Sequence, residues 1–329
     1  MRTGFATIMI HVLVTDHYQP ESLAKLKATG NFIIEHSCDT YPTETELKPA
    51  HVLLIRSRTD INEKLLKKAP NLKLVVSATA GFDHIDYVLA AHQNVICQYT
   101  PQANDISAAE HTMSLILGLC KNLINSHQAI LNGAWRNQLP RRELLQGKTL
   151  CLIGLGRIGS KVASMAQAFS MKVFAHDPYV DDSVYQSLKV ERIGLVEAFR
   201  HADYLSLHVP LTKKTRGMIN KSTLAEFSSD CFLINASRGG VIIEQELVEA
   251  LKAKKLAGAA LDVFNSEPLP IESPLRQLPN VILTPHAGAY TEQALQMASN
   301  QAVEKVIDFF AGASPLDTVP PLAEWAKDL

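Results

Sequence analysis

The strongest constraint on the fold is a short apolar run followed at once by a glycine-rich turn, a helical pattern and a second apolar run. The first run is Leu150–Ile153, and the second, Lys172–Ala175, leads into Asp177. Between them stands the sequence Gly154-Leu155-Gly156-Arg157-Ile158-Gly159. This order predicts a strand–helix–strand unit of a parallel sheet, with the helix starting at the end of the turn.

Each part of this unit has a physical role in binding a dinucleotide. Gly154 allows the tight turn, Gly156 lets a pyrophosphate approach the backbone, and Gly159 lets the helix pack on the strand. The helix N-terminus offers free N–H groups and a positive dipole end. Asp177 can accept hydrogen bonds from the adenosine ribose, although it could also be a plain strand-end acid. No basic residue follows it closely, so we expect NAD rather than NADP.

Composition narrows the class of protein. A length of 329 residues predicts two domains. A hydrophobic share of 47%, a charged share of 20% and a net charge of -1 argue against a disordered chain and against nucleic acid as a partner. The apolar runs at 8–14 and 113–120 are too short to span a bilayer, so no membrane partner is expected. The five cysteines lack paired spacing, so we expect no metal site and a cytoplasmic protein.

Strand and helix patterns alternate along both halves of the chain. Strands are expected at Ile8–Val14, Phe32–Glu35, Val52–Ile55, Leu72–Ser77 and Val95–Tyr99, which predicts a flavodoxin-like open parallel sheet. A second set is expected at Leu150–Ile153, Lys172–Ala175, Leu205–Val209, Phe232–Asn235, Ala259–Val263 and Val281–Thr284. Six is the number of strands that a Rossmann domain uses. The fold class is therefore α/β, with two doubly wound parallel-sheet domains.

The segment 105–135 is expected to be helical and apolar on most of its circumference. Ser107 and Glu110 have capping-box spacing, which predicts a helix start at Ser107. A helix that is apolar nearly all round must be buried on several sides. We therefore expect a homodimer formed through this region, with a purely internal helix as the alternative.

An arginine, a carboxylate and a histidine follow the last three expected strands; they are Arg238, Glu267 and His286. Ligands of open parallel sheets bind beyond the carboxyl ends of the strands. An imidazole exchanges protons near neutral pH, a neighbouring carboxylate orients it, and a guanidinium binds a substrate carboxylate. The alternatives are an ordinary surface or core histidine, a turn acid and a surface-loop arginine. We expect the three side chains to meet beside the nicotinamide.

With these motifs, the chain resembles the D-isomer-specific 2-hydroxyacid dehydrogenase family over essentially its full length. The matching segments are Gly154–Gly159, Ile234–Gly240, Asp262–Phe264 with Glu267-Pro268, and Thr284–His286. Three upstream segments match as well: Ala80–Asp86, Ser107–Thr112 and Gly133–Trp135.

The resemblance implies reversible hydride transfer between NAD and C2 of a small-molecule D-2-hydroxy or 2-oxo acid. It implies that residues 105–289 form a Rossmann NAD-binding domain. This domain would be inserted in a flavodoxin-like substrate domain made of residues 1–104 and 290–329. His286 would be the general acid and base, Glu267 its partner, and Arg238 the anchor for the substrate carboxylate.

The expected ligand contacts fall into three sets. Cofactor contacts in and after the glycine turn are expected from Gly154, Gly156, Arg157, Ile158, Gly159 and Asp177. Cofactor contacts after the later strands are expected from Val209, Pro210, Ala236, Ser237, Asp262, His286 and Gly288. Asp262 is expected at the nicotinamide amide, with a structural role as the alternative. Substrate contacts are expected from Arg56, Ala80, Gly81, Asn104 and Arg238.

The substrate expectation depends on Arg56 and Arg58, which end an apolar strand on the same side of its pleat. Within the family this resembles the phosphoglycerate dehydrogenases, so 3-phosphoglycerate or 3-phosphohydroxypyruvate is expected. Solvent-exposed arginines are the alternative. Two other functions are considered: a glyoxylate, hydroxypyruvate or other small 2-oxoacid reductase, and a non-enzymatic NAD(H)-sensing scaffold. Arg141 and Arg142 have no predicted role.

Overall fold

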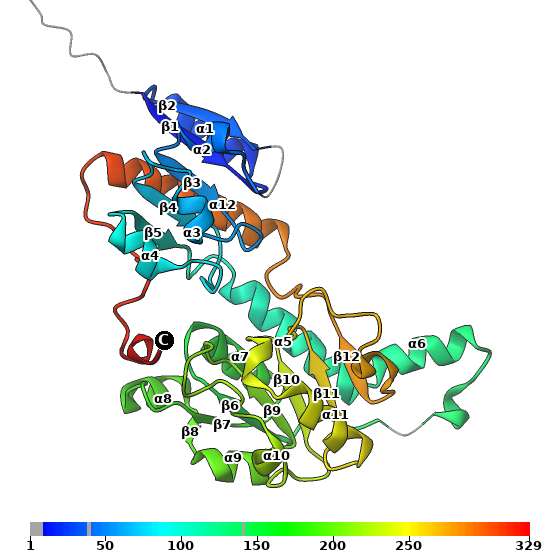
Figure 1. Cartoon of the computed structure of the whole chain (residues 1–329). Coiled ribbons are helices and arrows are strands. Elements are labelled where there is room, and N and C mark those ends of the chain that lie inside the picture. Colours follow the sequence, from blue (N-terminus) through cyan, green and yellow to red (C-terminus); the bar gives the residue numbers. More distant parts are fainter. Residues whose placement is uncertain (1–8, 38–40, 140–141) are drawn as a thin grey trace, which may run out of the picture. The chain divides into compact units, whose positions relative to one another are not determined.

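The computed structural model describes residues 9–37, 41–139 and 142–329. The chain divides into two compact units (Figure 1). The first unit consists of residues 1–104 and 290–323, and the second of residues 105–289 and 324–329. Ile8 and Arg141, which figure in the expectations above, lie outside the described residues.

The first unit is built on one parallel sheet with the strand order β2-β1-β3-β4-β5. Its strands are β1 Ile10–Val14, β2 Phe32–His36, β3 Val52–Ile55, β4 Leu74–Ser77 and β5 Ile96–Tyr99. Its helices are α1 Pro20–Ala28, α2 Glu44–Leu47, α3 Glu63–Leu66, α4 Tyr87–His92 and α12 Glu292–Phe310. The strand order is that of a flavodoxin-like doubly wound sheet, which confirms the predicted architecture.

Alternate residues of each strand in this sheet supply two hydrophobic cores, one on each face. Leu13 and Leu53 pack with buried residues of α2, α3 and α4 on one face. Val12 and Leu54 pack with α1 and α12 on the other face. In Figure 1, α12 is the orange helix beside this sheet, far in sequence from the strands that it covers.

The second unit carries a larger parallel sheet with the strand order β12-β11-β10-β9-β6-β7-β8. Its strands are β6 Thr149–Ile153, β7 Lys172–His176, β8 Glu191–Arg192, β9 Tyr204–Leu207, β10 Phe232–Asn235, β11 Gly258–Leu261 and β12 Val281–Leu283. Its helices are α5 Asp105–Cys120, α6 Leu123–Leu131, α7 Arg157–Ala168, α8 Asp182–Leu188, α9 Leu195–His201, α10 Lys221–Leu224 and α11 Glu244–Lys252. The order reverses between β6 and β9, as in a Rossmann fold, so the predicted fold class is confirmed.

Helices cover both faces of this second sheet. Leu150 and Leu152 of β6 face the buried residues of α5, α7 and α8. Cys151 and Ile153 face those of α9, α10 and α11. Because most strands of this sheet are buried on both faces, their sequences are largely apolar, which made them recognisable.

The seventh strand corrects the expected count of six. Strand β8 contains only Glu191 and Arg192, both exposed, and pairs with Phe174 and Ala175 at the edge of the sheet. Two polar residues give no strand periodicity, so the sequence alone did not reveal it.

The segment 105–135 is also different from the expectation. It forms two helices, separated at Asn122, whose φ of 47° lies in the left-handed region. Helix α5 begins at Asp105, so Ser107 lies inside the helix and not at its start. Helix α5 is largely buried, but α6 contains no buried residue and projects from the sheet of its unit (Figure 1).

The final residues belong to the second unit and not to the substrate domain assigned to 290–329. The Asp328 carboxylate accepts a hydrogen bond from the Tyr179 hydroxyl at 2.6 Å and pairs with Lys214 at 3.0 Å. The Asp328 carbonyl also accepts a hydrogen bond from the Lys213 N–H at 2.9 Å. These polar contacts hold the segment 324–329 against the second unit. Polar contacts leave no periodic apolar pattern, so the sequence did not indicate this position.

Candidate active site

The glycine turn between β6 and α7 is packed against the rest of the unit at Gly154 and Gly159 and is open at Gly156. Gly154 has a φ of 100°, and a Cβ there would collide with the carbonyl oxygen of His208. A Cβ on Gly159 would collide with the carbonyl oxygen of Gly154, so α7 lies directly on the turn. A Cβ on Gly156 would meet nothing within 4 Å, so its backbone faces open space at the N-terminus of α7.

Asp177 lies beside this turn at the end of β7. Its two carboxylate oxygens accept hydrogen bonds from the N–H groups of Leu155 at 2.8 Å and Tyr179 at 2.9 Å. These bonds fix the carboxylate, and each oxygen keeps a lone pair for a further donor such as a ribose hydroxyl. The turn, the helix N-terminus and the acid together fit an NAD molecule.

Arg192 is a basic residue close to Asp177 that the sequence pattern did not reveal. Its guanidinium donates to the Asp177 carbonyl at 3.0 Å and forms an ion pair with Asp182 at 2.7 Å. It comes from the short edge strand β8, which explains why it was not recognised. Because Asp182 already pairs with this charge, Arg192 does not reverse the expected preference for NAD.

His286 and Glu267 form a direct pair. The Nδ1 atom of His286 lies 2.7 Å from Oε2 of Glu267, and the two side chains are 48% and 36% exposed. The other oxygen of Glu267 accepts the Phe264 N–H at 3.0 Å. Partial burial raises the pKa of Glu267. The hydrogen bonds from His286 and Phe264 lower this pKa by a larger amount, so it lies below its ordinary value. Glu267 is therefore an ionised partner that holds the imidazole ring in place.

Arg238 comes from the neighbouring loop. A Cβ on Gly239 would collide with the carbonyl of Phe264, so the loops after β10 and β11 touch through their main chains. The guanidinium of Arg238 donates to the Ser237 carbonyl at 2.7 Å, and its charge is close enough to lower the pKa of Glu267. The structure thus brings Arg238, Glu267 and His286 to the same edge of the sheet.

The other expected cofactor residues of the second unit also lie at the carboxyl ends of strands. Val209 and Pro210 follow β9, and Ala236 and Ser237 follow β10. Asp262 follows β11, is 1% exposed, and accepts hydrogen bonds from the N–H groups of Ala287 at 2.8 Å and Gly288 at 2.9 Å. Asp262 is therefore fixed to the loop that bears His286.

The expected substrate residues, apart from Arg238, lie in the first unit. Arg56 and the pair Ala80-Gly81 follow β3 and β4, which are neighbours in the sheet. Asn104 is the last residue of this unit before α5, and its Oδ1 atom is buried with no hydrogen-bond partner among the described residues. An unsatisfied buried acceptor of this kind is suited to a ligand that carries a donor.

The two arginines near β3, expected on the same side of the strand, have different surroundings. Arg58 pairs with Asp16 at 2.6 Å, and the Asp16 side chain is only 5% exposed. The Arg56 guanidinium forms no hydrogen bond or ion pair within the described ranges 9–37, 41–139 and 142–329, although its carbonyl accepts the Thr59 N–H at 3.3 Å. Of the two guanidinium groups, only that of Arg58 has an acidic partner among the described residues.

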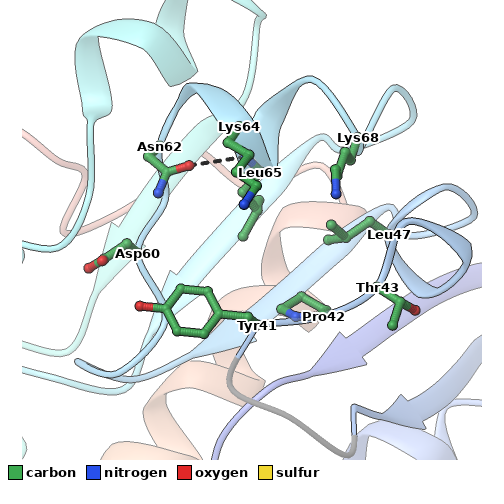
Figure 2. Close-up of a pocket in the computed structure, with 9 residues that line it drawn as sticks. All are labelled: Tyr41, Pro42, Thr43, Leu47, Asp60, Asn62, Lys64, Leu65 and Lys68. Atoms are coloured by element: carbon green, nitrogen blue, oxygen red, sulfur yellow. Dashed lines mark hydrogen bonds between the residues drawn. The ribbon is translucent and has the colours of Figure 1, made fainter.

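A separate cavity of about 420 Å³ lies in the first unit (Figure 2). Its lining consists of Tyr41, Pro42, Thr43, Leu47, Asp60, Asn62, Lys64, Leu65 and Lys68. None of the expected substrate residues lines it, so this cavity is not the expected site. Outside this cavity, the Arg142 guanidinium, which had no predicted role, donates to the Lys121 carbonyl at 3.0 Å.

Comparison with known proteins identifies relatives along almost the whole chain. Residues 113–288 match the family described as D-isomer specific 2-hydroxyacid dehydrogenase, NAD binding domain. The chain is 38% identical over 299 residues to a D-3-phosphoglycerate dehydrogenase of Methanocaldococcus jannaschii, covering 91% of this chain and 57% of that protein. It is 37% identical to the Bacillus subtilis protein of the same name, covering 94% and 59%. The chain thus spans a little over half the length of these relatives.

Solved structures match over almost the full length of both chains. The TT0316 protein of Thermus thermophilus superposes with a TM-score of 0.85 at 30% identity, covering 94% of this chain and 100% of that one. A D-lactate dehydrogenase of Aquifex aeolicus, complexed with NAD and lactic acid, superposes with a TM-score of 0.81 at 31% identity, covering 92% and 96%. No helix among the described residues is both long and apolar enough to cross a bilayer. With its fold, its glycine turn and these matches, the chain belongs to the D-isomer-specific 2-hydroxyacid dehydrogenase family, and residues 113–288 are the NAD-binding domain of that family.

Proposed function

We propose that this protein is an NAD-dependent dehydrogenase that interconverts a D-2-hydroxy acid and the corresponding 2-oxo acid. The observation that carries the proposal is the 2.7 Å pair of His286 and Glu267 with Arg238 beside it. These groups follow three strands of the sheet that carries the glycine turn. The names of the relatives, D-3-phosphoglycerate and D-lactate dehydrogenases, support the same reaction type.

His286 has the position of a general acid and base. Its Nδ1 atom faces the Glu267 carboxylate and therefore carries a proton, which leaves Nε2 to exchange a proton with the substrate oxygen. In reduction, His286 gives this proton to the C2 oxygen, and in oxidation it removes it. Bound NAD supplies or accepts the hydride. The planar guanidinium of Arg238 binds the substrate carboxylate in a two-point contact and orients C2.

The remaining contacts are proposed with the same roles as above. The N–H groups of Ala80 and Gly81 and the amide of Asn104 are proposed as further substrate donors. Gly154, Gly156, Arg157, Ile158, Gly159 and Asp177 are proposed to hold the adenosine and pyrophosphate of NAD. Val209, Pro210, Ala236, Ser237, Asp262, His286 and Gly288 are proposed to line the nicotinamide end. The buried thiols Cys97, Cys120, Cys151 and Cys231 are free, which supports a reducing, cytoplasmic location.

The preferred substrate in this proposal is 3-phosphoglycerate, or 3-phosphohydroxypyruvate in reverse. It is supported by the guanidinium of Arg56, which has no ion-pair partner among the residues that the structure describes, and by the names of two similar relatives. A second candidate is a small unphosphorylated 2-oxo acid. It is supported by the likeness to the D-lactate dehydrogenase, whose structure contains lactic acid.

A homodimer is also proposed, formed through the region 105–135. Helix α6 has no buried residue in the single chain, yet Leu123, Ile124, Ile130 and Leu131 are between 48% and 65% exposed. A helix of nine residues is not stable on its own in water, so an apolar face of this size requires a partner surface. A second copy of the chain would supply it.

Replacing His286 by Ala tests the mechanism. We expect kcat to fall by about 10²- to 10⁴-fold in reduction of a 2-oxo acid, because the proton donor is removed. NADH binding, measured by fluorescence titration, is expected to persist. Glu267→Gln is the companion variant: it should also lower kcat, because the imidazole loses the ionised partner that holds it in place. Full turnover by His286→Ala would remove this residue from the mechanism.

Replacing Asp177 by Ala tests the cofactor assignment. We expect kcat/KM for NADH to fall by about 10- to 100-fold, because the ribose loses its acceptor, while the value for NADPH does not fall. The measurement is steady-state kinetics with both cofactors at one 2-oxo acid concentration. Asp181→Ala, at an exposed acid four positions away, is the control with the same charge change. An unchanged NADH-to-NADPH ratio in Asp177→Ala would contradict the assignment.

Replacing Arg56 by Ala tests the proposal that its guanidinium binds the phosphate of the substrate. We expect KM for 3-phosphohydroxypyruvate to rise by about 10- to 100-fold and KM for hydroxypyruvate to stay unchanged, because only the first carries a phosphate. Arg58→Ala is the matched control, since Asp16 already neutralises that arginine. If wild-type protein uses both acids equally and Arg56→Ala alters neither, the phosphorylated substrate is wrong and a small 2-oxo acid replaces it.

Replacing Ile124 by Lys tests the homodimer. We expect the variant to elute at half the mass of the wild type in size-exclusion chromatography with light scattering, because a charge in the apolar contact is left without a partner. Val196→Lys on α9, where Val196 is 47% exposed, is the control for an exposed apolar residue outside this region. A wild-type protein that is monomeric at all concentrations would refute the proposal.

A further inference from the structure

The loop that bears His286 is attached to the first two turns of α5. The Asp262 carboxylate lies between them and is 1% exposed. Its Oδ1 atom accepts the Thr284 hydroxyl at 2.6 Å and the Ala287 N–H at 2.8 Å, and His111 Nε2 lies 3.1 Å from the same oxygen. Its Oδ2 atom accepts the Gly288 N–H at 2.9 Å. One buried carboxylate therefore links His111 of the helix to three residues of the loop.

The hydrogen-bond pattern determines which nitrogen of His111 carries a proton. Nε2 lies 3.1 Å from both the Asp262 carboxylate and the Thr284 hydroxyl oxygen. The single hydroxyl proton of Thr284 is already directed to Asp262, so Thr284 can only accept from His111. Nε2 must therefore be protonated and donate to this pair of oxygens. A side chain without an N–H at this point would leave the carboxylate with one donor fewer.

A second contact from the same face of α5 supports this attachment. The Ser107 hydroxyl donates to the carbonyl of Gly288 at 2.7 Å. Ser107 and His111 are four residues apart and therefore adjacent on the helix surface. A Cβ added to Gly288 would lie 3.2 Å from Oδ2 of Asp262 and 3.7 Å from Cδ2 of His111, so the loop lies close against the helix.

The loop needs such support because His286 adopts an unfavourable backbone conformation. Its φ is 52°, in the left-handed region that residues other than glycine seldom occupy. Its N–H donates to the Asp262 carbonyl at 2.8 Å. A residue in this region keeps its conformation only where the surrounding contacts determine it. Asp262 supplies those contacts through its carbonyl and both carboxylate oxygens.

We infer that His111 is a positioning residue that, through Asp262 and the loop 284–288, holds His286 in the geometry in which it faces Glu267. This inference rests on the proposed function for its effect on turnover. Burial raises the pKa of Asp262. Four hydrogen bonds, from His111, Thr284, Ala287 and Gly288, lower this pKa by a larger amount, so it lies below its ordinary value. Asp262 is accordingly an ionised group whose position depends on these donors.

The test compares His111→Leu with His111→Gln. The Gln amide reaches the position of Nε2 and keeps an N–H donor there, whereas Leu fills the space without one. We expect His111→Leu to lower kcat about 10- to 100-fold, because His286 is misplaced, and to change KM for NADH by a smaller factor, because the glycine turn and Asp177 are not altered. His111→Gln should recover most of the loss. His201→Leu, the same change at an exposed histidine, should match the wild type.

A second measurement needs neither substrate nor cofactor. Hydrogen–deuterium exchange by mass spectrometry should show faster exchange of the amides of Ala287 and Gly288 in His111→Leu and rates close to wild type in His111→Gln. If His111→Leu does not fold, Ser107→Ala removes one bond of the same attachment and should give the same effects at smaller size.

The outcomes separate this inference from the proposed function. Wild-type kcat and wild-type exchange in His111→Leu would overturn the inference, as would equal losses in the Leu and Gln variants, which would indicate packing and not a donor. Wild-type protein without turnover of any 2-oxo acid would instead overturn the proposed function. In that case the exchange rates alone decide whether His111 fixes the loop.

Discussion

The architecture of the second unit depends on places where two stretches of main chain approach more closely than any side chain would allow. Helix α7 lies directly on the glycine turn because Gly159 has no Cβ, and the loop of Arg238 touches the loop of Glu267 because Gly239 has none. The first approach directs free N–H groups toward a pyrophosphate. The second brings a guanidinium beside the carboxylate that holds His286. The proposed binding of NAD and the proposed chemistry thus both depend on glycines that let two main-chain segments touch at the same edge of the sheet.

Two carboxylates near His286 have different environments and therefore different uses. Asp262 is buried, and hydrogen bonds from the loop and from α5 satisfy both of its oxygens. Glu267 is 36% exposed and uses one oxygen for the main chain and the other for the imidazole. Both have a pKa below the ordinary value, although burial acts in the opposite direction in each case. The first organises the loop, and the second acts on the ring that the loop carries.

Local patterns in the sequence were sufficient for most strands, for the glycine turn and for the grouping of Arg238, Glu267 and His286. Continuous apolar strands and glycine spacing are local signals, and strand ends of a parallel sheet meet at one edge by necessity. Strand β8 and Arg192 were missed because two exposed polar residues carry no periodicity. Ser107 was misread as a helix cap because its partner, Gly288, is 181 positions away. The pairing of Arg58 with Asp16 depends on a turn geometry that composition does not encode.

The bond between Ser107 and Gly288 lies at a notable place in the chain. The polypeptide passes from the first unit to the second after Asn104 and returns after Ala289. Ser107 follows the first passage by a few residues, and Gly288 comes just before the second. Both connections therefore start from one anchored point, and that point is the loop that carries His286. The Ser107–Gly288 hydrogen bond thus joins the two ends of the segment 105–289 directly beside the loop residue His286.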